Sequence, residues 1–101
     1  MYGLIGSTKA ALESIVRHFA LELGQRGINL NVIRAGLIET DSTRALPNQE
    51  QTFARAQTRS LVGRTLLGRD VADMVLYLAS PLSDMVQGQV LAVDAGSSIH
   101  S

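Results

Sequence analysis

Two short apolar runs of strand length, 28–33 and 89–93, most constrain the fold of this chain. The first alternates apolar and polar residues before it becomes apolar on both faces, and the second is a brief apolar run that Gln89 opens. Parallel neighbouring strands need a long crossover, which is usually helical and almost always right-handed. Because the long segment between the runs carries helical signals, the sequence predicts two parallel strands joined by a helical crossover.

Two stretches have the i, i+3, i+4, i+7 apolar spacing of an amphipathic helix. The stronger covers residues 7–23, before the first strand, and the other follows Asp70, which can cap it, and ends at Pro81. Between them, Pro47-Asn48 opens a polar segment that predicts a short helix, whereas 37–44 has no clear period. The apolar stripe of the first helix consists of Leu12, Ile15, Val16, Phe19, Ala20 and Leu23.

The predicted order is helix, strand, short helix, helix, strand, which is an incomplete α/β arrangement. A parallel pair with apolar faces normally has neighbouring strands and helices on both sides, and two strands alone are marginal in water. The strand at 28–33 would otherwise present a bare apolar edge. Since the sequence has no internal repeat and no domain boundary, we expect residues 1–101 to form one partial domain of a larger fold.

Composition excludes several classes of function. Nine cationic and nine anionic side chains give no net charge, and the arginines are scattered, which argues against a nucleic-acid surface. The chain has no cysteine and only two histidines, so a metal centre is not expected. No apolar run approaches the roughly 20 residues that cross a bilayer. We therefore expect a cytoplasmic protein without a membrane or nucleic-acid partner.

One tyrosine and one lysine near the start of the chain have a spacing that suggests chemistry. Lys9 is the only lysine, and it follows Tyr2 by seven residues. On an α-helix, positions seven apart differ by about 20° from two full turns and by about 10 Å along the axis, so they share a face. Each alone is ordinary, because a terminal tyrosine usually frays and a lone lysine is usually solvated. Their joint pattern is what carries the interpretation.

The pattern Tyr2-x6-Lys9, followed by KAALESIVRHFALELGQRGINLNVIRAGLIETD and GRDVADMVLYLASPLSDMVQGQVLAVDAG, resembles the carboxyl-terminal half of the short-chain dehydrogenase/reductase family. The resemblance covers essentially all 101 residues. The step of seven is similar to the enoyl-(acyl-carrier-protein) reductase branch, since other members would need a tyrosine where Ile5 stands. The run ETDSTRALPN resembles the NADPH-using enoyl reductases. Two departures are Ala35, where many members carry proline, and Ala95, where they often carry a second glycine.

The resemblance implies the C-terminal part of a Rossmann-like, doubly wound parallel sheet and an NAD(P)H-dependent oxidoreductase of fatty-acid biosynthesis. Tyr2 and Lys9 would be the catalytic pair, with Lys9 also holding the nicotinamide ribose. Gly36, Ile38 and Thr40 would bind the cofactor: Gly36 through close approach, Ile38 through its backbone and Thr40 through its hydroxyl. The segment 41–66 would cover the substrate, which fits its weak periodicity.

The resemblance also implies partners and leaves alternatives open. The cofactor would be NADPH or NADH, without a metal, and the substrate an acyl thioester on acyl carrier protein. A homo-oligomer would form through the first helix, with Ala11, Ser14 and Leu21 as candidate seam residues. Reduction of a 3-oxoacyl thioester or another carbonyl is the alternative reaction. A non-catalytic dimerisation or association module is the alternative of another class.

One expected feature of a dinucleotide reductase is missing from the sequence. Such an enzyme needs a glycine-rich turn between a strand and a helix, where backbone N–H groups meet the pyrophosphate. Gly3 and Gly6 precede a helix, but no strand lies before them. We therefore expect a partial chain in which the cofactor-binding amino-terminal half is absent. Alone, it should neither bind the cofactor tightly nor turn over substrate.

Overall fold

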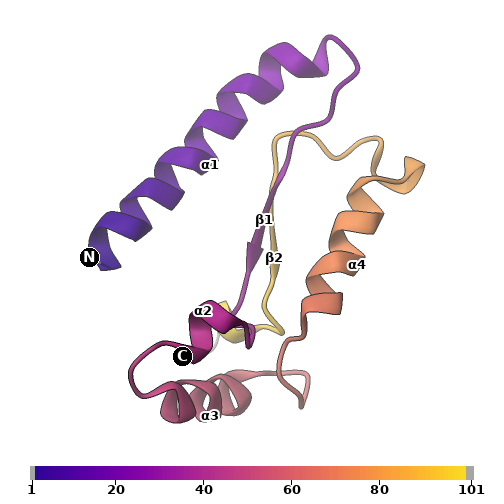
Figure 1. Ribbon diagram of the computed structural model, residues 1–101. Helices are drawn as coiled ribbons and strands as arrows, with labels where there is room; N and C mark the ends of the chain where they lie inside the picture. The colour runs from indigo at the N-terminus through magenta and orange to yellow at the C-terminus, as the bar shows by residue number, and fades with distance from the viewer. Residues whose placement is uncertain (1, 100–101) are drawn as a thin grey trace. The chain divides into compact units, whose positions relative to one another are not determined.

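The computed structural model describes residues 2–99, apart from the side chains of residues 2–5 and 42. Its elements, labelled in Figure 1, are α1 (Tyr2–Gly24), β1 (Val32–Ala35), α2 (Asp41–Arg44), α3 (Gln49–Arg59), α4 (Gly68–Leu78) and β2 (Val90–Val93), with 3₁₀ turns at Pro81–Ser83 and Ser97–Ile99. The chain divides into two compact units, and each is described by itself. The first comprises Met1–Val32 and Tyr77–Leu91, and the second comprises Ile33–Leu76 and Ala92–Ser101.

The two strands pair with each other in a parallel sheet, as the sequence predicts (Figure 1). The amide of Val32 donates to the carbonyl of Gln89 at 2.9 Å, and the amide of Gly36 donates to the carbonyl of Val93 at 2.9 Å. Both bonds join residues with the same sequence offset, which only a parallel pairing gives. The prediction of an α/β fold with a helical crossover is therefore confirmed.

The first strand begins later than predicted, at Val32 rather than at residue 28. Side-chain amides explain the shift, because they take the place of ladder bonds before β1. The amide of Leu30 donates to Gln87 Oε1 at 2.7 Å, and the amide of Gln89 donates to Asn31 Oδ1 at 2.9 Å. The apolar–polar alternation at 28–31 therefore reflects these side-chain bonds and not a strand with one solvated face.

Gln87 ties together three backbone groups of the first unit. Its Nε2 donates to the carbonyl of Ala20 at 2.8 Å and to that of Ile28 at 3.1 Å, while its Oε1 accepts from Leu30. The turn that follows α1 contains Gly27 at φ 77°, a left-handed conformation that favours glycine. The side-chain amide group of Gln87 thus links the carboxyl end of α1 to the segment that leads into β1.

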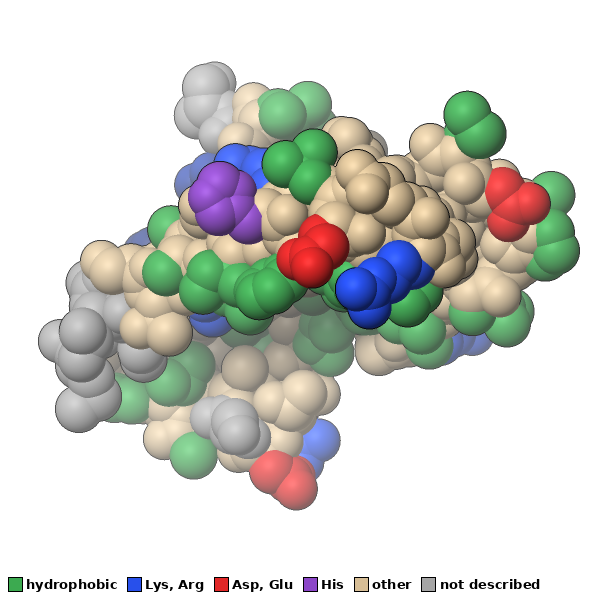
Figure 2. Space-filling model, turned by 90° about the horizontal axis from the view of Figure 1, so that it is seen from above, with side chains coloured by type: hydrophobic (Ala, Val, Ile, Leu, Met, Phe, Trp, Pro, Cys, Tyr) green, Lys and Arg blue, Asp and Glu red, His purple; other side chains and the backbone are tan. Residues whose placement is uncertain are grey.

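Few side chains of the described chain are buried. Ala20 on α1 is the one buried apolar residue among them, and the predicted stripe on this helix remains largely open. Leu12, Ile15 and Phe19 are 56%, 50% and 52% exposed. Figure 2 shows hydrophobic side chains at the surface in several places. Within the described residues, no helix has the length and apolar character needed to cross a membrane.

The predicted helices at 49–59 and after Asp70 are present, and the role of Asp70 differs from the prediction. This residue lies inside the first turn of α4 rather than at its cap. Its carboxylate accepts from the amide of Leu67 at 2.7 Å and forms two bonds with the Arg64 guanidinium, at 2.7 and 2.8 Å. Asp70 therefore reaches back to the start of the helix instead of preceding it.

Candidate functional site

The candidate site is the loop that leaves the carboxyl end of β1 in the second unit. In open parallel sheets, ligands bind beyond the carboxyl ends of the strands. Gly36 opens this loop beside the end of β2. A Cβ atom at Gly36 would lie 3.1 Å from the Asp94 Cβ and 3.2 Å from its Cα. The close approach of Asp94 therefore favours glycine at this position.

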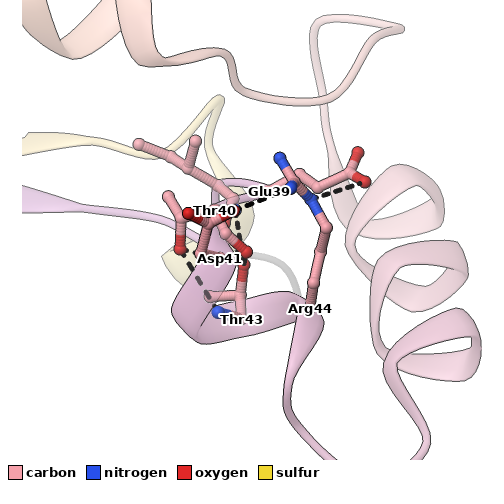
Figure 3. Close-up of polar contacts among 6 residues, drawn as sticks. Glu39, Thr40, Asp41, Thr43 and Arg44 are labelled. Atoms are coloured by element: carbon pink, nitrogen blue, oxygen red, sulfur yellow. Dashed lines mark hydrogen bonds and ion pairs between the residues drawn. The ribbon is translucent and has the colours of Figure 1, made fainter.

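Thr40 and Thr43 hold each other at the start of α2 (Figure 3). The Thr40 side chain accepts from the Thr43 amide at 3.2 Å, and the Thr40 amide donates to Thr43 Oγ1 at 2.7 Å. This reciprocal pair is a capping box, which satisfies two backbone donors that the helix alone would leave free. The Thr40 hydroxyl accepts in this pair and so can still donate its proton elsewhere.

The peptide groups of Ile38 differ in how they are held. Thr43 Oγ1 donates to the Ile38 carbonyl at 2.8 Å. The Ile38 amide has no hydrogen-bond partner within the described part of the chain, and the residue is half-buried. An amide without a protein partner can donate to water or to a ligand. The loop can therefore offer this N–H to a ligand carbonyl.

Charged side chains fix the outer side of the same loop. Arg44 Nε lies 3.3 Å from Glu39 Oε1, and Arg44 Nη1 lies 2.9 Å from Asp41 Oδ1 (Figure 3). These groups are largely exposed, so solvent screens each ion pair and its contribution to stability is small. Their effect is to link the residues on either side of Thr40 through one guanidinium.

A cavity of about 210 Å³ lies in the second unit, between the strand ends and α3. Its lining residues are Gly36, Leu37, Thr52, Arg55, Ala56, Arg59, Ser60, Leu66, Asp94, Ala95 and Ser97. Hydrogen bonds from the Ser98 side chain and from the Gly96 and Ser98 amides lower the pKa of Asp94. The Asp94 Oδ1 accepts from the Gly96 amide at 2.9 Å, so this side chain holds the turn that follows β2.

The predicted site residues fall into the two units. Tyr2 and Lys9 both lie on α1 in the first unit, because this helix begins at Tyr2 and not at residue 7, where the sequence pattern predicts its start. Lys9 is exposed, and the Tyr2 side chain lies outside the described part. Gly36, Ile38 and Thr40 lie together on the loop of the second unit. Within the described residues, no group of three or more His, Cys, Asp or Glu side chains could hold a metal ion.

Thr43 is the residue of this loop that sequence reasoning missed. Its signal was present, because Thr40-x-x-Thr43 has the spacing of a capping box with threonine in place of the usual Glu or Gln. The following α2 spans only four residues, Asp41–Arg44, and is too short to show an apolar period. Without a recognised helix, the spacing had no element to cap.

Solved structures with the same fold are short-chain dehydrogenases/reductases. One is an enoyl-acyl carrier protein reductase of Bacillus cereus, crystallised with NADP+ and indole naphthyridinone. It is 34% identical with a TM-score of 0.92, and the match covers 99% of this chain and 39% of the Bacillus chain. A short-chain type dehydrogenase/reductase from Mycobacterium ulcerans is 33% identical with a TM-score of 0.83, covering 94% of this chain and 34% of that one. These neighbours define the class.

Sequence relatives narrow the class to one branch. The family described as Enoyl-(Acyl carrier protein) reductase matches residues 1–98. Enoyl-(acyl-carrier-protein) reductase (NADH) 2 of Rhizobium meliloti is 39% identical over 99% of this chain, and the Escherichia coli reductase (NADH) is 34% identical over 97%. The chain therefore belongs to the short-chain dehydrogenases/reductases, in their enoyl-(acyl-carrier-protein) reductase branch. It spans 37% of the length of each of these two relatives.

Proposed function

We propose that this chain supplies the catalytic pair and the nicotinamide-facing loop of an NAD(P)H-dependent reductase. Its substrate would be an enoyl thioester on acyl carrier protein, in the cytoplasmic synthesis of fatty acids. The observation that carries the proposal is the family match over residues 1–98, which includes all five predicted site residues. The names of the relatives, which are enoyl reductases, support the same reaction.

The loop after β1 fits a flat ring that carries an amide. Gly36 presents no side chain toward an approaching ring, and the Ile38 amide is available to donate to a ligand carbonyl. Thr40 keeps a hydroxyl proton that can be donated while its oxygen caps α2. A nicotinamide bound here would supply hydride, and its carboxamide would match these groups.

Tyr2 and Lys9 would stabilise the charge that develops on the substrate. Hydride addition at the β-carbon moves the electron pair of the double bond toward the thioester oxygen, and a proton at the α-carbon completes the reduction. The Tyr2 hydroxyl would donate to that oxygen as it becomes negative. The Lys9 ammonium would bind the ribose hydroxyls and favour the nearby anion.

The indications for the preferred nicotinamide cofactor differ. The resemblance of ETDSTRALPN favours NADPH, whereas the names of the Rhizobium and Escherichia relatives specify NADH and the Bacillus structure carries NADP+. Both cofactors are therefore compared in each assay. We propose NADPH as the preferred cofactor and NADH as the alternative.

The Tyr2→Phe variant tests the catalytic role. We define the reconstituted reductase as this chain joined to the portion of Rhizobium meliloti reductase 2 that precedes the matched region. Removing the phenol hydroxyl should lower the turnover of a crotonyl thioester by about 10²- to 10⁴-fold, which is typical for loss of an acid–base group. Oxidation of reduced nicotinamide, followed by its absorbance, measures the rate. Tyr77→Phe on α4 is the matched control and should leave the rate unchanged.

The outcomes separate the candidate functions. A wild-type reconstituted reductase that reduces a 3-oxoacyl thioester and leaves the enoyl thioester intact would replace the proposed reaction with carbonyl reduction. If the wild-type protein assembles but reduces neither thioester, the non-catalytic association module is supported. An active enzyme in which Tyr2→Phe changes nothing contradicts the role of Tyr2 while the reaction itself stands.

Association through α1 is the second candidate function, and one observation favours it. Leu12, Ile15 and Phe19 form a row of exposed apolar side chains along this helix, and Leu21 is 73% exposed. Such a row is unusual on a surface that meets only water. We propose that α1 forms the seam of a homo-oligomer, which sedimentation of the reconstituted reductase would detect.

A further inference from the structure

We propose that Thr43 is a positioning residue for the cofactor. Its hydroxyl would hold the loop after β1 so that the Ile38 amide and the Thr40 hydroxyl face the nicotinamide. The inference rests on the proposed function and adds to it a residue that neither the sequence pattern nor the resemblance assigns. It is carried by the contacts of a single oxygen atom.

Thr43 Oγ1 joins two consecutive peptide groups of the loop. It accepts from the Thr40 amide at 2.7 Å (Figure 3). It also donates to the Ile38 carbonyl at 2.8 Å. The first group belongs to the Glu39–Thr40 peptide and the second to the Ile38–Glu39 peptide. A hydroxyl has one proton and two lone pairs, so both contacts can form at once. The path of the chain from Ile38 to Thr40 is thereby fixed.

The other side of Ile38 is fixed by the sheet. The Gly36 amide donates to the Val93 carbonyl at 2.9 Å, which continues the strand pairing to the start of the loop. Ile38 therefore lies between a peptide anchored by β2 and peptides anchored by Thr43. Its own amide, without a partner in the described chain, is held in place from both directions.

Thr43 also decides what the Thr40 hydroxyl can do. The Thr43 amide donates to Thr40 Oγ1 at 3.2 Å, and the two hydroxyl oxygens are 3.2 Å apart. When Thr43 gives its proton to the Ile38 carbonyl at 2.8 Å and not to the Thr40 carbonyl at 3.1 Å, the Thr40 proton can go to Thr43 Oγ1 or to a ligand. Valine has nearly the shape of threonine but no hydroxyl. At the half-buried position of Thr43, it would fill the same space without forming these hydrogen bonds.

A purely structural role would have a different effect from a positioning role. Loss of a helix cap costs about 1 kcal/mol of stability, and through the amount of folded enzyme it should lower the apparent kcat without changing KM. Loss of positioning should weaken the binding of the cofactor specifically. A rise in the Michaelis constant for the reduced cofactor therefore indicates a positioning role, whereas a fall in the apparent kcat alone indicates a purely structural one.

Thr43→Val and Thr43→Ser in the reconstituted reductase provide the test. In Thr43→Val we expect the KM and the dissociation constant of NADPH or NADH to rise about tenfold, as for one lost hydrogen bond, with kcat within about twofold. Thr43→Ser keeps the hydroxyl and should restore both constants. Exchange of the Thr40 amide with deuterium should be faster in the valine variant alone. The matched control is Ser80→Ala, outside the segment 41–66, which removes a 2.7 Å bond from the Ser80 hydroxyl to the Tyr77 carbonyl.

The outcomes separate the positioning role of Thr43 from the proposed function. Unchanged cofactor affinity in Thr43→Val, with the wild-type protein binding the cofactor, overturns the positioning role and leaves the proposed function standing. Equal losses in the valine and serine variants also overturn it, since the hydroxyl would then not matter. A wild-type reconstituted reductase that binds neither NADPH nor NADH overturns both the positioning role and the proposed function.

Discussion

At the scale of single residues, crowding and not turn conformation explains the glycine after β1. A turn glycine is usually required for a left-handed backbone, and Gly27, Gly63, Gly88 and Gly96 have positive φ values of this kind. Gly36 does not, but a Cβ there would meet the Cβ and Cα atoms of Asp94 at 3.1 and 3.2 Å. One of these atoms is backbone, so the contact cannot be relieved by a side-chain rotation.

Substituting Gly36 with alanine should therefore destabilise the protein. We expect a loss of about 1–3 kcal/mol in the free energy of unfolding, the usual cost of an overpacked contact. Gly68→Ala is the control: no atom lies within 4 Å of its Cβ position at the start of α4, so a gain of up to about 1 kcal/mol is expected. Urea denaturation of the reconstituted reductase measures both. Equal effects of the two substitutions would contradict the crowding explanation.

Residue identities predicted part of the candidate site. The loop glycine, Ile38 and Thr40 could be found because the resemblance assigns them, and the structure places all three on one loop. Thr43 could not, since its role depends on a helix of four residues. Ala95 shows the reverse case: a position where the resemblance leads us to expect glycine has φ 54°, a left-handed conformation that alanine adopts at a cost.

At the scale of elements, the start of α4 depends on one carboxylate. The hydrogen bond from the Arg64 guanidinium, with the amide of Leu67, lowers the pKa of Asp70 below its ordinary value. A lowered pKa means that the folded state favours the ionised form. The stabilisation is therefore fully present above the ordinary aspartate pKa of about 4 and is lost as the pH falls below it.

The Asp70→Asn variant tests this pH dependence. At neutral pH it should unfold at a lower urea concentration than the parent protein, because asparagine cannot form the same charged pair with Arg64. The difference should shrink as the pH falls from about 5 toward 2. Asp73→Asn on the same helix is the control, since that side chain is exposed and makes no hydrogen bond within the described part. A difference that is constant with pH would refute the ionised pair.

Element types followed from the sequence better than element limits did. A repeated apolar spacing predicts a long amphipathic helix, and α1 and α4 both have this spacing. The start of β1 could not be read in the same way, because Asn31 and Gln87 replace backbone ladder bonds with side-chain bonds. Such bonds join residues more than 50 positions apart, and no local pattern records them.

At the scale of the whole molecule, the exposed apolar surface predicts how the chain behaves alone. Large side chains from both units are open to solvent, including Leu82 at 81% and Met85 at 96%. We expect the isolated chain to bind an environment-sensitive apolar dye and the reconstituted reductase to bind several-fold less. Dye fluorescence at equal protein concentration measures this, and an equal signal from the two proteins would contradict it.

NADPH should bind the isolated chain with a dissociation constant above the micromolar range, which quenching of cofactor fluorescence tests.

The Gln87 amide has a consequence for the order of folding during synthesis. It satisfies the Ala20 and Ile28 carbonyls and the Leu30 amide, all of which leave the ribosome long before residue 87 does. Until then, these three backbone groups lack their bonds to the Gln87 side chain. This corner of the molecule closes late, and a nascent-chain chaperone would meet it open.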